Sequence, residues 1–385
     1  MVKRRPMRAK KKKPVKELAQ ALKKQNTKRE PVWKGPSDTD PQGGITQSLL
    51  STFLCCRERF RIRVVEGLSP PDQFNHRIEY GNMWHLCEEA YATADKHTGW
   101  KTELHDYCVG LSKKYPLSQE QIVKWYEVCK VQFPIYLKYW AKDPDEKKRK
   151  PVMAEQSFRV PYTLPSGRIV QLRGKWDGVS KYGRKYYLDE HKTKGEVSPE
   201  QIRRQMDFDL QTMLYLVALY RSRDDIAGVR YNVVRRPLAG GKHSIRQHKP
   251  TKSNPKGESS SEYYTRLGGL IAEEPEHYFH RWKVDITGTD VERFCTQFLN
   301  PILEQLCNWW HSMQHCLAPW KVDNDREAGP GASWTVTNPV HWRTPYGFWN
   351  VLAEGGSTDL DEYLATGSEV GLERGQPLFR ELEEE

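Results

Sequence analysis

Apolar residues recur at helical spacing in the segment 118–140, which predicts a helix with one buried face. Two earlier segments also have helical character: ITQSLLSTFLCCRERFRIRVVEGL (45–68) and the region around HRIEYGNMWHLCEEAYATA (76–94). Residues 142–150 form a charged break. The first part of the chain is therefore expected to be helical and to end near residue 150.

Extended patterning follows this break. Strands are predicted over 152–162, 168–180 and 184–193, with the turn signals LPSG and KYGR between them. Ser198 is a suitable N-cap and Pro199 suits the first helical position, which predicts a helix from 198 to about 223. A fourth strand at 227–236 and a final helix near 288–317 come next. The order helix, strand, strand, strand, helix, strand predicts an α/β protein with a mixed sheet flanked by helices.

The positive charge of the chain lies almost entirely in its first 30 residues. Of the 385 residues, 61 are Lys or Arg and 50 are Asp or Glu, a net charge of +11. Residues 1–30 hold 13 of the basic residues and two of the acidic ones, so the remainder is neutral overall. Such a tail is expected to be disordered, and its charge suits a polyanion such as DNA. A solubilising tail without a specific partner is an equal alternative.

A second basic stretch lies inside the body. No acidic residue occurs from 229 to 257, and the Gly, Pro and Ser content predicts a long loop. Its candidate DNA-backbone contacts are Arg235, Arg236, Lys242, Arg246, Lys249 and Lys252. No apolar run approaches the roughly 18 residues of a membrane span, and no signal peptide is recognisable. We therefore expect a cytoplasmic protein without membrane contact.

The hairpin formed by residues 170–193 carries the candidate chemistry. A two-residue Tyr182-Gly183 turn would place Leu188 opposite Asp177. Because side chains alternate along a strand, Glu190 and Lys192 then share the face of Asp177. Asp189 would point away, although a one-residue bulge would reverse the choice between the two acids.

Two carboxylates together with phosphate oxygens suit Mg²⁺ (or Mn²⁺), and this predicts metal-dependent cleavage of a phosphodiester. Asp177 and Glu190 are the predicted metal ligands, and Lys192 can orient water or offset charge developing on the phosphate. Gln211 and Tyr215 lie one turn apart on the following helix and so share a face. They could hold the lysine or contact nucleic acid.

These motifs, with SLLSTFLCCRERF, GNMWH, AEQSF, GKWDGV, DEHKTKG and QTMLY in this order, resemble the PD-(D/E)XK nuclease superfamily. The resemblance is to its RecB-like exonuclease branch, including phage-encoded and CRISPR-associated members, over roughly residues 45–320. It implies a restriction-endonuclease-like core with added N- and C-terminal helices. It also implies that His85 of GNMWH is a further metal ligand and that Glu155 is an accessory acid.

The resemblance suggests a domain plan in five parts. These are a basic tail and linker (1–44), a helical region carrying the His motif (45–150), the nuclease core (151–236), a basic loop insertion (237–285) and a C-terminal helix with an aromatic region (286–385). Several relatives hold an iron–sulfur cluster, for which Cys55 or Cys56 with Cys295, Cys307 and Cys316 are the candidates. The spacing of the later cysteines favours free, buried thiols instead.

The favoured function is a DNA exonuclease acting in phage or bacterial recombination, repair or processing, in the cytoplasm of the bacterial or phage-infected host cell. Its expected partners are DNA and other recombination or replication proteins. The alternatives are a structure-specific endonuclease or nickase, and a DNA-binding accessory protein without catalysis.

Overall fold

The computed structural model describes most of the chain between residues 31 and 316. The described residues are 31–37, 40–55, 57–69, 72–93, 99–198, 200, 202, 204, 209–223, 225–237, 245–252, 255–316, 373–374, 378–379 and 382. The basic tail, Lys242 and most of the aromatic C-terminal region lie outside them. The chain divides into two compact units, Met1–Gly44 with Leu49–Pro71 and Leu303–Arg380, and Ile45–Ser48 with Asp72–Ile302 and Glu381–Glu385.

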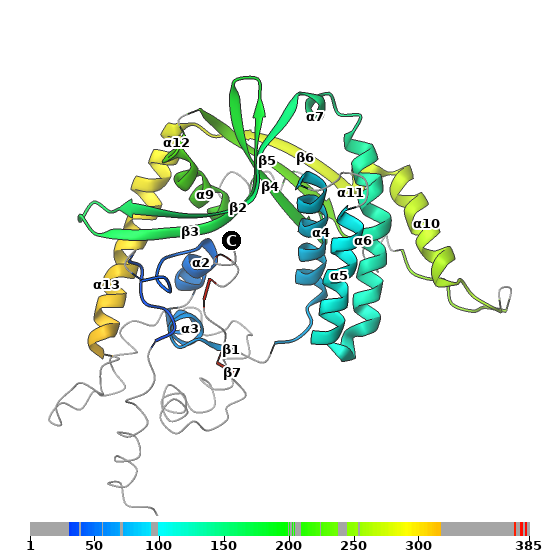
Figure 1. The fold of residues 1–385 in the computed structure, drawn as a ribbon, viewed down its shortest axis with the longest axis horizontal. Coiled ribbons are helices and arrows are strands. Elements are labelled where there is room, and N and C mark those ends of the chain that lie inside the picture. Colours follow the sequence, from blue (N-terminus) through cyan, green and yellow to red (C-terminus); the bar gives the residue numbers. More distant parts are fainter. Residues whose placement is uncertain are drawn as a thin grey trace, which may run out of the picture. The chain divides into compact units, whose positions relative to one another are not determined.

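A five-stranded sheet in the order β2-β3-β4-β5-β6 forms the centre of the second unit (Figure 1). The strands are β2 (Arg149–Thr163), β3 (Ile169–Tyr182), β4 (Lys185–Lys194), β5 (Ile226–Arg235) and β6 (Phe279–Asp285). Only the β4–β5 pair is parallel. Four strands were predicted from alternation and turn signals, and the structure confirms them and adds β6. The sheet is mixed and flanked by helices, as the α/β prediction required.

Helix α9 (Leu210–Tyr220) joins the parallel strands β4 and β5, a connection that needs a crossover. Asp209 caps it by accepting a hydrogen bond from the backbone N–H of Thr212 at 3.3 Å. Because Asp209 is extended, one continuous helix from 198 to 223 was the wrong prediction. A helical hydrogen bond from Ile202 N to Ser198 O does confirm helical structure where that segment begins.

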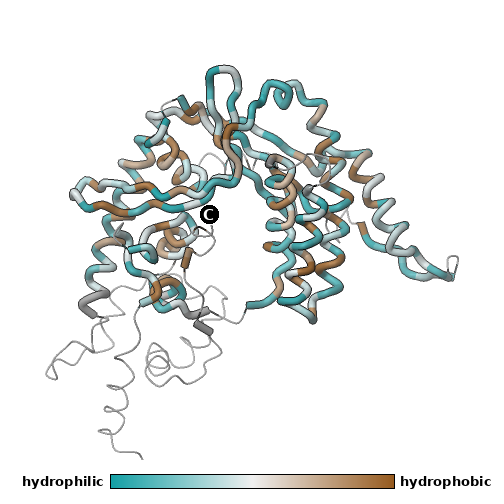
Figure 2. The backbone as a smooth tube through the Cα atoms, in the orientation of Figure 1, coloured by the Kyte–Doolittle hydropathy of each residue, from teal (hydrophilic) through white to brown (hydrophobic). Residues whose placement is uncertain are grey.

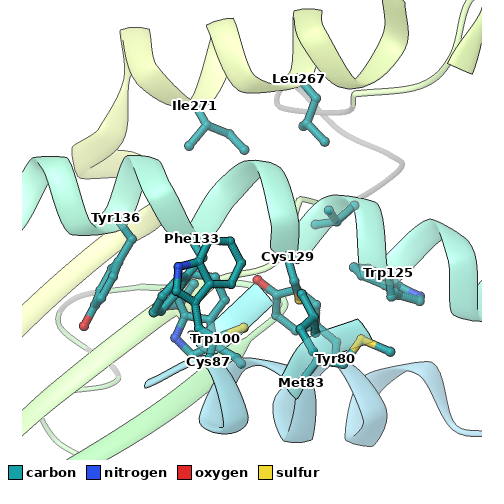
Figure 3. Close-up of a cluster of buried hydrophobic side chains, with 14 of the residues drawn as sticks. Tyr80, Met83, Cys87, Trp100, Trp125, Cys129, Phe133, Tyr136, Leu267 and Ile271 are labelled. Carbon is teal, nitrogen blue, oxygen red and sulfur yellow. The ribbon is translucent and has the colours of Figure 1, made fainter. Parts of the chain in front are cut away.

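Helices α4 (His76–Thr93), α5 (Gly99–Lys114), α6 (Gln119–Trp140) and α10 (Ser260–Glu273) build the main core with one face of the sheet. In α6 the buried side chains Ile122, Trp125, Cys129, Phe133 and Tyr136 follow the three-to-four-residue spacing of one helix face. Figure 3 shows the last four of them. Figure 2 shows polar and apolar segments following one another within each of these helices. The buried residues of α5, α6 and α10 recur mostly at intervals of three to four, so each of these helices buries one stripe.

Two helices of this layer were not predicted. The buried residues of α5 are spaced four, four and three apart, but mostly polar residues separate them. Helix α10 lies in the segment expected to be a loop insertion, and so do α11 (Pro275–Tyr278) and β6. The missed signal is local: Ser259 and Glu262 form a capping box at the start of α10. The insertion is thus an irregular stretch followed by regular structure.

The first unit has an aromatic core of its own. Its members Trp33, Phe53, Phe60, Trp309 and Trp310 pack edge to face with ring centroids 4.9–5.7 Å apart. The remaining elements of the chain are α2 (Gln47–Cys55), α3 (Arg57–Phe60), η1 (Arg61–Val65), β1 (Leu68–Ser69), η2 (Pro116–Ser118), α7 (Pro144–Lys148), α12 (Gly288–Phe294), η3 (Cys295–Leu299), α13 (Asn300–Cys316) and β7 (Glu373–Arg374). No helix in the described part of the chain has both the length and the apolar character to cross a membrane.

Candidate active site

The candidate site lies where β3 and β4 separate. The two strands pair from Tyr182↔Lys185 to Gly178↔Asp189, and beyond that point β3 pairs with β2 and β4 with β5. Asp177 and Glu190 are the next residues on their strands. Both therefore stand where the β3–β4 ladder ends and the fork opens.

The predicted hairpin register was wrong by two residues. The turn contains Gly183 and Arg184, not Tyr182 and Gly183, so Val179 rather than Asp177 pairs with Leu188. Gly183 takes the left-handed conformation (φ 63°) that such a turn favours. A two-residue shift preserves the alternation of faces. The expected grouping of Asp177 with Glu190 therefore does not depend on the error.

Glu190, Lys192 and Gln211 form one hydrogen-bonded group. The Lys192 ammonium lies 2.6 Å from Glu190 Oε1 and donates to Gln211 Oε1 at 2.8 Å. The Gln211 amide donates in turn to Glu190 Oε1 at 2.9 Å. The Tyr215 hydroxyl lies 3.5 Å from the same amide, at the limit of a hydrogen bond. The predicted glutamine thus reaches the predicted lysine from α9.

The second oxygen of Glu190 has a different environment. Glu190 is fully buried, and within the described part of the chain its Oε2 has no hydrogen-bond partner. Burial and the nearby charge of Asp177 raise the pKa of Glu190 to about 7, against the opposing effect of Lys192. A buried carboxylate oxygen without a partner is an acceptor that a cation would satisfy.

His85, Glu155 and Asp177 converge from three elements. His85 Nδ1 lies 3.7 Å from Asp177 Oδ1 and 3.9 Å from Glu155 Oε1. One potential ligand atom from each of the three residues lies within 4.8 Å of the others. Burial favours a lower pKa for His85, but the charge of Asp177 and the contact with Glu155 raise the pKa of His85 to about 9. The site therefore attracts positive charge between its carboxylates.

Two backbone features bring these side chains together. Gly81 lies one turn before His85, and a Cβ at this position would meet the Thr193 hydroxyl at 3.3 Å. The small residue thus lets α4 approach β4 closely. Glu155 has a left-handed backbone (φ 44°) inside β2, a conformation that costs about 1–3 kcal/mol for a residue with a side chain. Strain of this kind is most often found at functional sites.

Asp189, the alternative acid of the triplet, faces other partners. It is fully buried, and its Oδ1 accepts from Arg230 Nε at 2.7 Å while its Oδ2 accepts from Arg149 Nη2 at 3.0 Å. The Ser180 hydroxyl donates to the same carboxylate. The two arginines hold the pKa of Asp189 well below its usual range, although burial alone would raise it. Asp189 belongs to a buried ionic network, and the one-residue bulge that would have exchanged the two acids is not found in the β3–β4 ladder.

Sequence reasoning missed a buried pair next to the site. His191 Nδ1 lies 3.4 Å from Glu88 Oε1, and the backbone N–H of His191 donates to Asp177 Oδ2 at 2.6 Å. Both residues line a cavity of about 280 Å³ that also borders Glu155 and Asp177. Glu88 could have been suspected from the sequence, because it lies three residues after His85 on the same helix.

The predicted DNA contacts that the structure describes differ in their exposure. Arg246, Lys249 and Lys252 are exposed on the segment after Ile245, Arg235 is half-buried and Arg236 is buried. Of the cysteines proposed for a cluster, Cys55 and Cys295 are half-buried and Cys307 is buried, and none of the three forms a disulfide. Cys56 and the side chain of Cys316 lie outside the described residues.

A fork of strands with two acids and a lysine, and with a histidine supplied by a helix, is an arrangement that suits metal-dependent cleavage of phosphodiesters. The family model described as the PD-(D/E)XK nuclease superfamily matches residues 45–310. The chain therefore belongs to the PD-(D/E)XK nuclease superfamily, whose members are nucleases that generally use divalent metal ions. A comparison with curated proteins returned no match.

Proposed function

We propose that this protein is a Mg²⁺- or Mn²⁺-dependent deoxyribonuclease, and that it acts as an exonuclease in DNA recombination, repair or processing. The observation that carries the proposal is the convergence of His85, Asp177, Glu190 and Lys192 at the strand fork, with Gln211 joining the last two. The exonuclease preference rests on the resemblance of the motifs to RecB-like exonucleases, including phage-encoded ones.

The donor set fits a hard divalent cation. His85, Asp177 and Glu155 have ligand atoms within 4.8 Å of one another and would hold the ion. Glu190, whose charge interacts with that of Asp177, would be a further carboxylate ligand. Carboxylate oxygens are the ligands that Mg²⁺ and Mn²⁺ prefer, and Glu190 Oε2 has no competing partner among the described residues. When bound, such an ion polarises the phosphate and lowers the pKa of a coordinated water.

The protein's own side chains orient the reaction. Burial would lower the pKa of Lys192, but Glu190 raises it above its usual value, so the ammonium stays charged at neutral pH. Lys192 therefore acts as a donor to the phosphate or the attacking water and not as a base. Gln211 fixes the direction of this ammonium through its 2.8 Å hydrogen bond. Burial raises the pKa of Tyr215, whose hydroxyl thus remains a donor beside Gln211.

The test is digestion of end-labelled linear DNA, single- and double-stranded, beside covalently closed circles, with Mg²⁺ or Mn²⁺ and with a chelator. Linear DNA should be degraded from its ends, circles should survive and chelation should stop the reaction. Cleaved circles would favour the endonuclease or nickase alternative. Lys192→Ala should bind DNA without cleaving it, whereas the control Lys185→Ala, an exposed lysine at the other end of β4, should cleave normally. Full activity of Lys192→Ala would refute the site.

Binding without cleavage by the wild-type protein under all these conditions would favour the alternative of a DNA-binding accessory protein. Against this alternative, a protein without catalysis has no need to keep a buried lysine–glutamate–glutamine group. Deletion of residues 1–30 provides a separate test. If the tail contacts the DNA backbone, its removal should lower both the affinity for DNA and the salt dependence of that affinity.

A further inference from the structure

A cluster of basic residues lies where α4 begins, at the carboxyl end of β5. The backbone N–H of Arg236 donates to Lys194 O at 2.8 Å, which continues the pairing of β4 with β5. Gln132 links this strand end to α4, because its amide donates to Arg235 O at 2.9 Å and its carbonyl accepts from the Tyr80 hydroxyl at 2.8 Å. The first turns of α4 therefore pack against the residues that end β5.

Arg236 is the unusual member of this cluster. Its side chain is 8% exposed, and within the described part of the chain neither Nε nor Nη1 has a hydrogen-bond partner. A buried polar group without a partner costs about 1–3 kcal/mol, and a charged group costs more. Arg230, by contrast, is a buried arginine that is paired with Asp189. Nε and Nη1 of Arg236 are thus two buried donors that no described residue satisfies.

The surroundings of Arg236 are positive as well. His76 and Arg77 are the first two residues of α4, and Lys124 follows on α6. Burial has the largest effect in lowering the pKa of His76, and the charges of Arg236, Arg77 and Lys124 lower it further. His76 is held in place by stacking on Trp125, with ring centroids 5.6 Å apart and an interplanar angle of 5°. The start of an 18-residue helix adds its own positive end.

We propose that Arg236, with His76 and Arg77, binds a backbone phosphate of the nucleic-acid strand that is cleaved at the strand fork. This inference rests on the proposed nuclease function. Helix α4 connects the two places, because His85 lies nine residues after His76 and so roughly 13 Å further along the helix axis. At about 3.4 Å per stacked nucleotide, this corresponds to about four nucleotides. The site would hold the strand in register while the fork acts on a different phosphate.

The test compares Arg236→Gln with Arg184→Gln, which removes the same charge from the exposed β3–β4 turn. Binding of a fluorescently labelled single-stranded oligonucleotide to the full chain is measured by anisotropy in a chelator over a range of salt concentrations. Arg236→Gln should weaken binding about tenfold or more and should lower the salt slope by about 0.7, the contribution of one phosphate on a single strand. Arg184→Gln should change neither. Equal affinity and slope for the two variants would overturn the proposal.

The melting temperature distinguishes phosphate binding by Arg236 from a structural role of this residue. Arg236→Met removes a buried charge that has two donors without a partner among the described residues. Its melting temperature should therefore equal or exceed that of the wild type while its oligonucleotide binding is weakened. Weak binding together with a lower melting temperature in both Arg236 variants would mean that Arg236 supports the fold, and the proposal would fail. Inorganic phosphate is the second probe. If inorganic phosphate raises the melting temperature of the wild type but not that of Arg236→Gln, and both bind the oligonucleotide equally, the site binds free phosphate and not a nucleic-acid strand.

The two proposals fail in different ways. If the wild type cleaves DNA and Arg236→Gln binds DNA as tightly as the wild type does, the proposed nuclease function stands and the proposed phosphate site is wrong. If the wild type does not cleave DNA, but the salt dependence of its oligonucleotide affinity changes in Arg236→Gln, the proposed nuclease function is wrong and the proposed phosphate site stands.

Discussion

Asp189→Asn and Glu190→Gln, made separately, each remove one negative charge from neighbouring residues of β4 and keep the size of the side chain. Both acids are fully buried, but their partners differ. Asp189 pairs with Arg230 and Arg149, whereas Glu190 faces the fork with Lys192. We expect Asp189→Asn to lower stability and Glu190→Gln to abolish cleavage with little effect on stability.

The magnitude for Asp189 follows from its ion pairs. Removing one partner of a buried pair costs about 3–5 kcal/mol, because the other charge remains buried. Arg230 keeps Glu146 at 2.9 Å, which favours the lower part of this range. At roughly 2–4 °C for each kcal/mol in a domain of this size, the melting temperature should fall by about 6–20 °C. Because the folded-state pKa of Asp189 is depressed, its contribution is complete at neutral pH and is lost only as the solution becomes acidic.

For Glu190 the effect of the ionised carboxylate on stability has the opposite sign. Its pKa is raised to about 7, so folding disfavours the ionised carboxylate. The resulting cost develops as the pH rises from the usual range of a glutamate to about 7 and persists above it. Glu190→Gln removes that cost, and at pH 8 in a chelator its melting temperature should equal or exceed that of the wild type. Its cleavage rate should fall by at least about 100-fold, because it loses a proposed metal ligand.

The assay is thermal unfolding followed by circular dichroism in a chelator, together with initial cleavage rates in Mg²⁺. Asp189→Asn, assayed below its melting temperature, should retain most of its cleavage rate. The reasoning fails if Asp189→Asn melts like the wild type yet is inactive, or if Glu190→Gln melts lower and remains active.

Three further predictions concern the strand pairing, the metal site and the cysteines. Gly228→Ala should lower the free energy of unfolding in urea by about 3 kcal/mol, because φ is 150° and a Cβ would lie 2.0 Å from Val284 O; an unchanged midpoint would contradict this. His85→Gln should weaken Mn²⁺ binding, measured by calorimetry, about tenfold or more, and equal binding would exclude His85 as a ligand. Burial raises the pKa of the Cys87 thiol, so iodoacetamide should modify half-buried Cys295 before Cys87. Peptide mass spectrometry measures the order, and modification of Cys87 before Cys295 would refute the burial argument.

Much of the core could be predicted because its signals are local. The LPSG and KYGR turns separate three strands, and the observed bounds differ from the predicted ones by at most three residues at β2 and two elsewhere in β3 and β4. The register of the β3–β4 hairpin was predicted with an offset of two residues, and the predicted grouping of Asp177 with Glu190 on one face relied on that register. Strand alternation has a period of two, so this error left the grouping intact. Helix α5, whose buried residues are widely separated by polar ones, carried too weak a signal.

The sequence by itself determined which residue types follow one another on each strand and helix, and hence that acids, a lysine and a glutamine succeed each other in the order of a PD-(D/E)XK nuclease. Only the tertiary structure decided which atoms meet. It brings His85 within 3.7 Å of Asp177, which lies 92 positions later, and pairs Asp189 with Arg230 from the neighbouring strand. It also leaves Nε and Nη1 of the buried Arg236 side chain without a partner among the described residues. Periodicity records the neighbours of a residue along the chain, whereas charge pairing and burial depend on packing between distant segments.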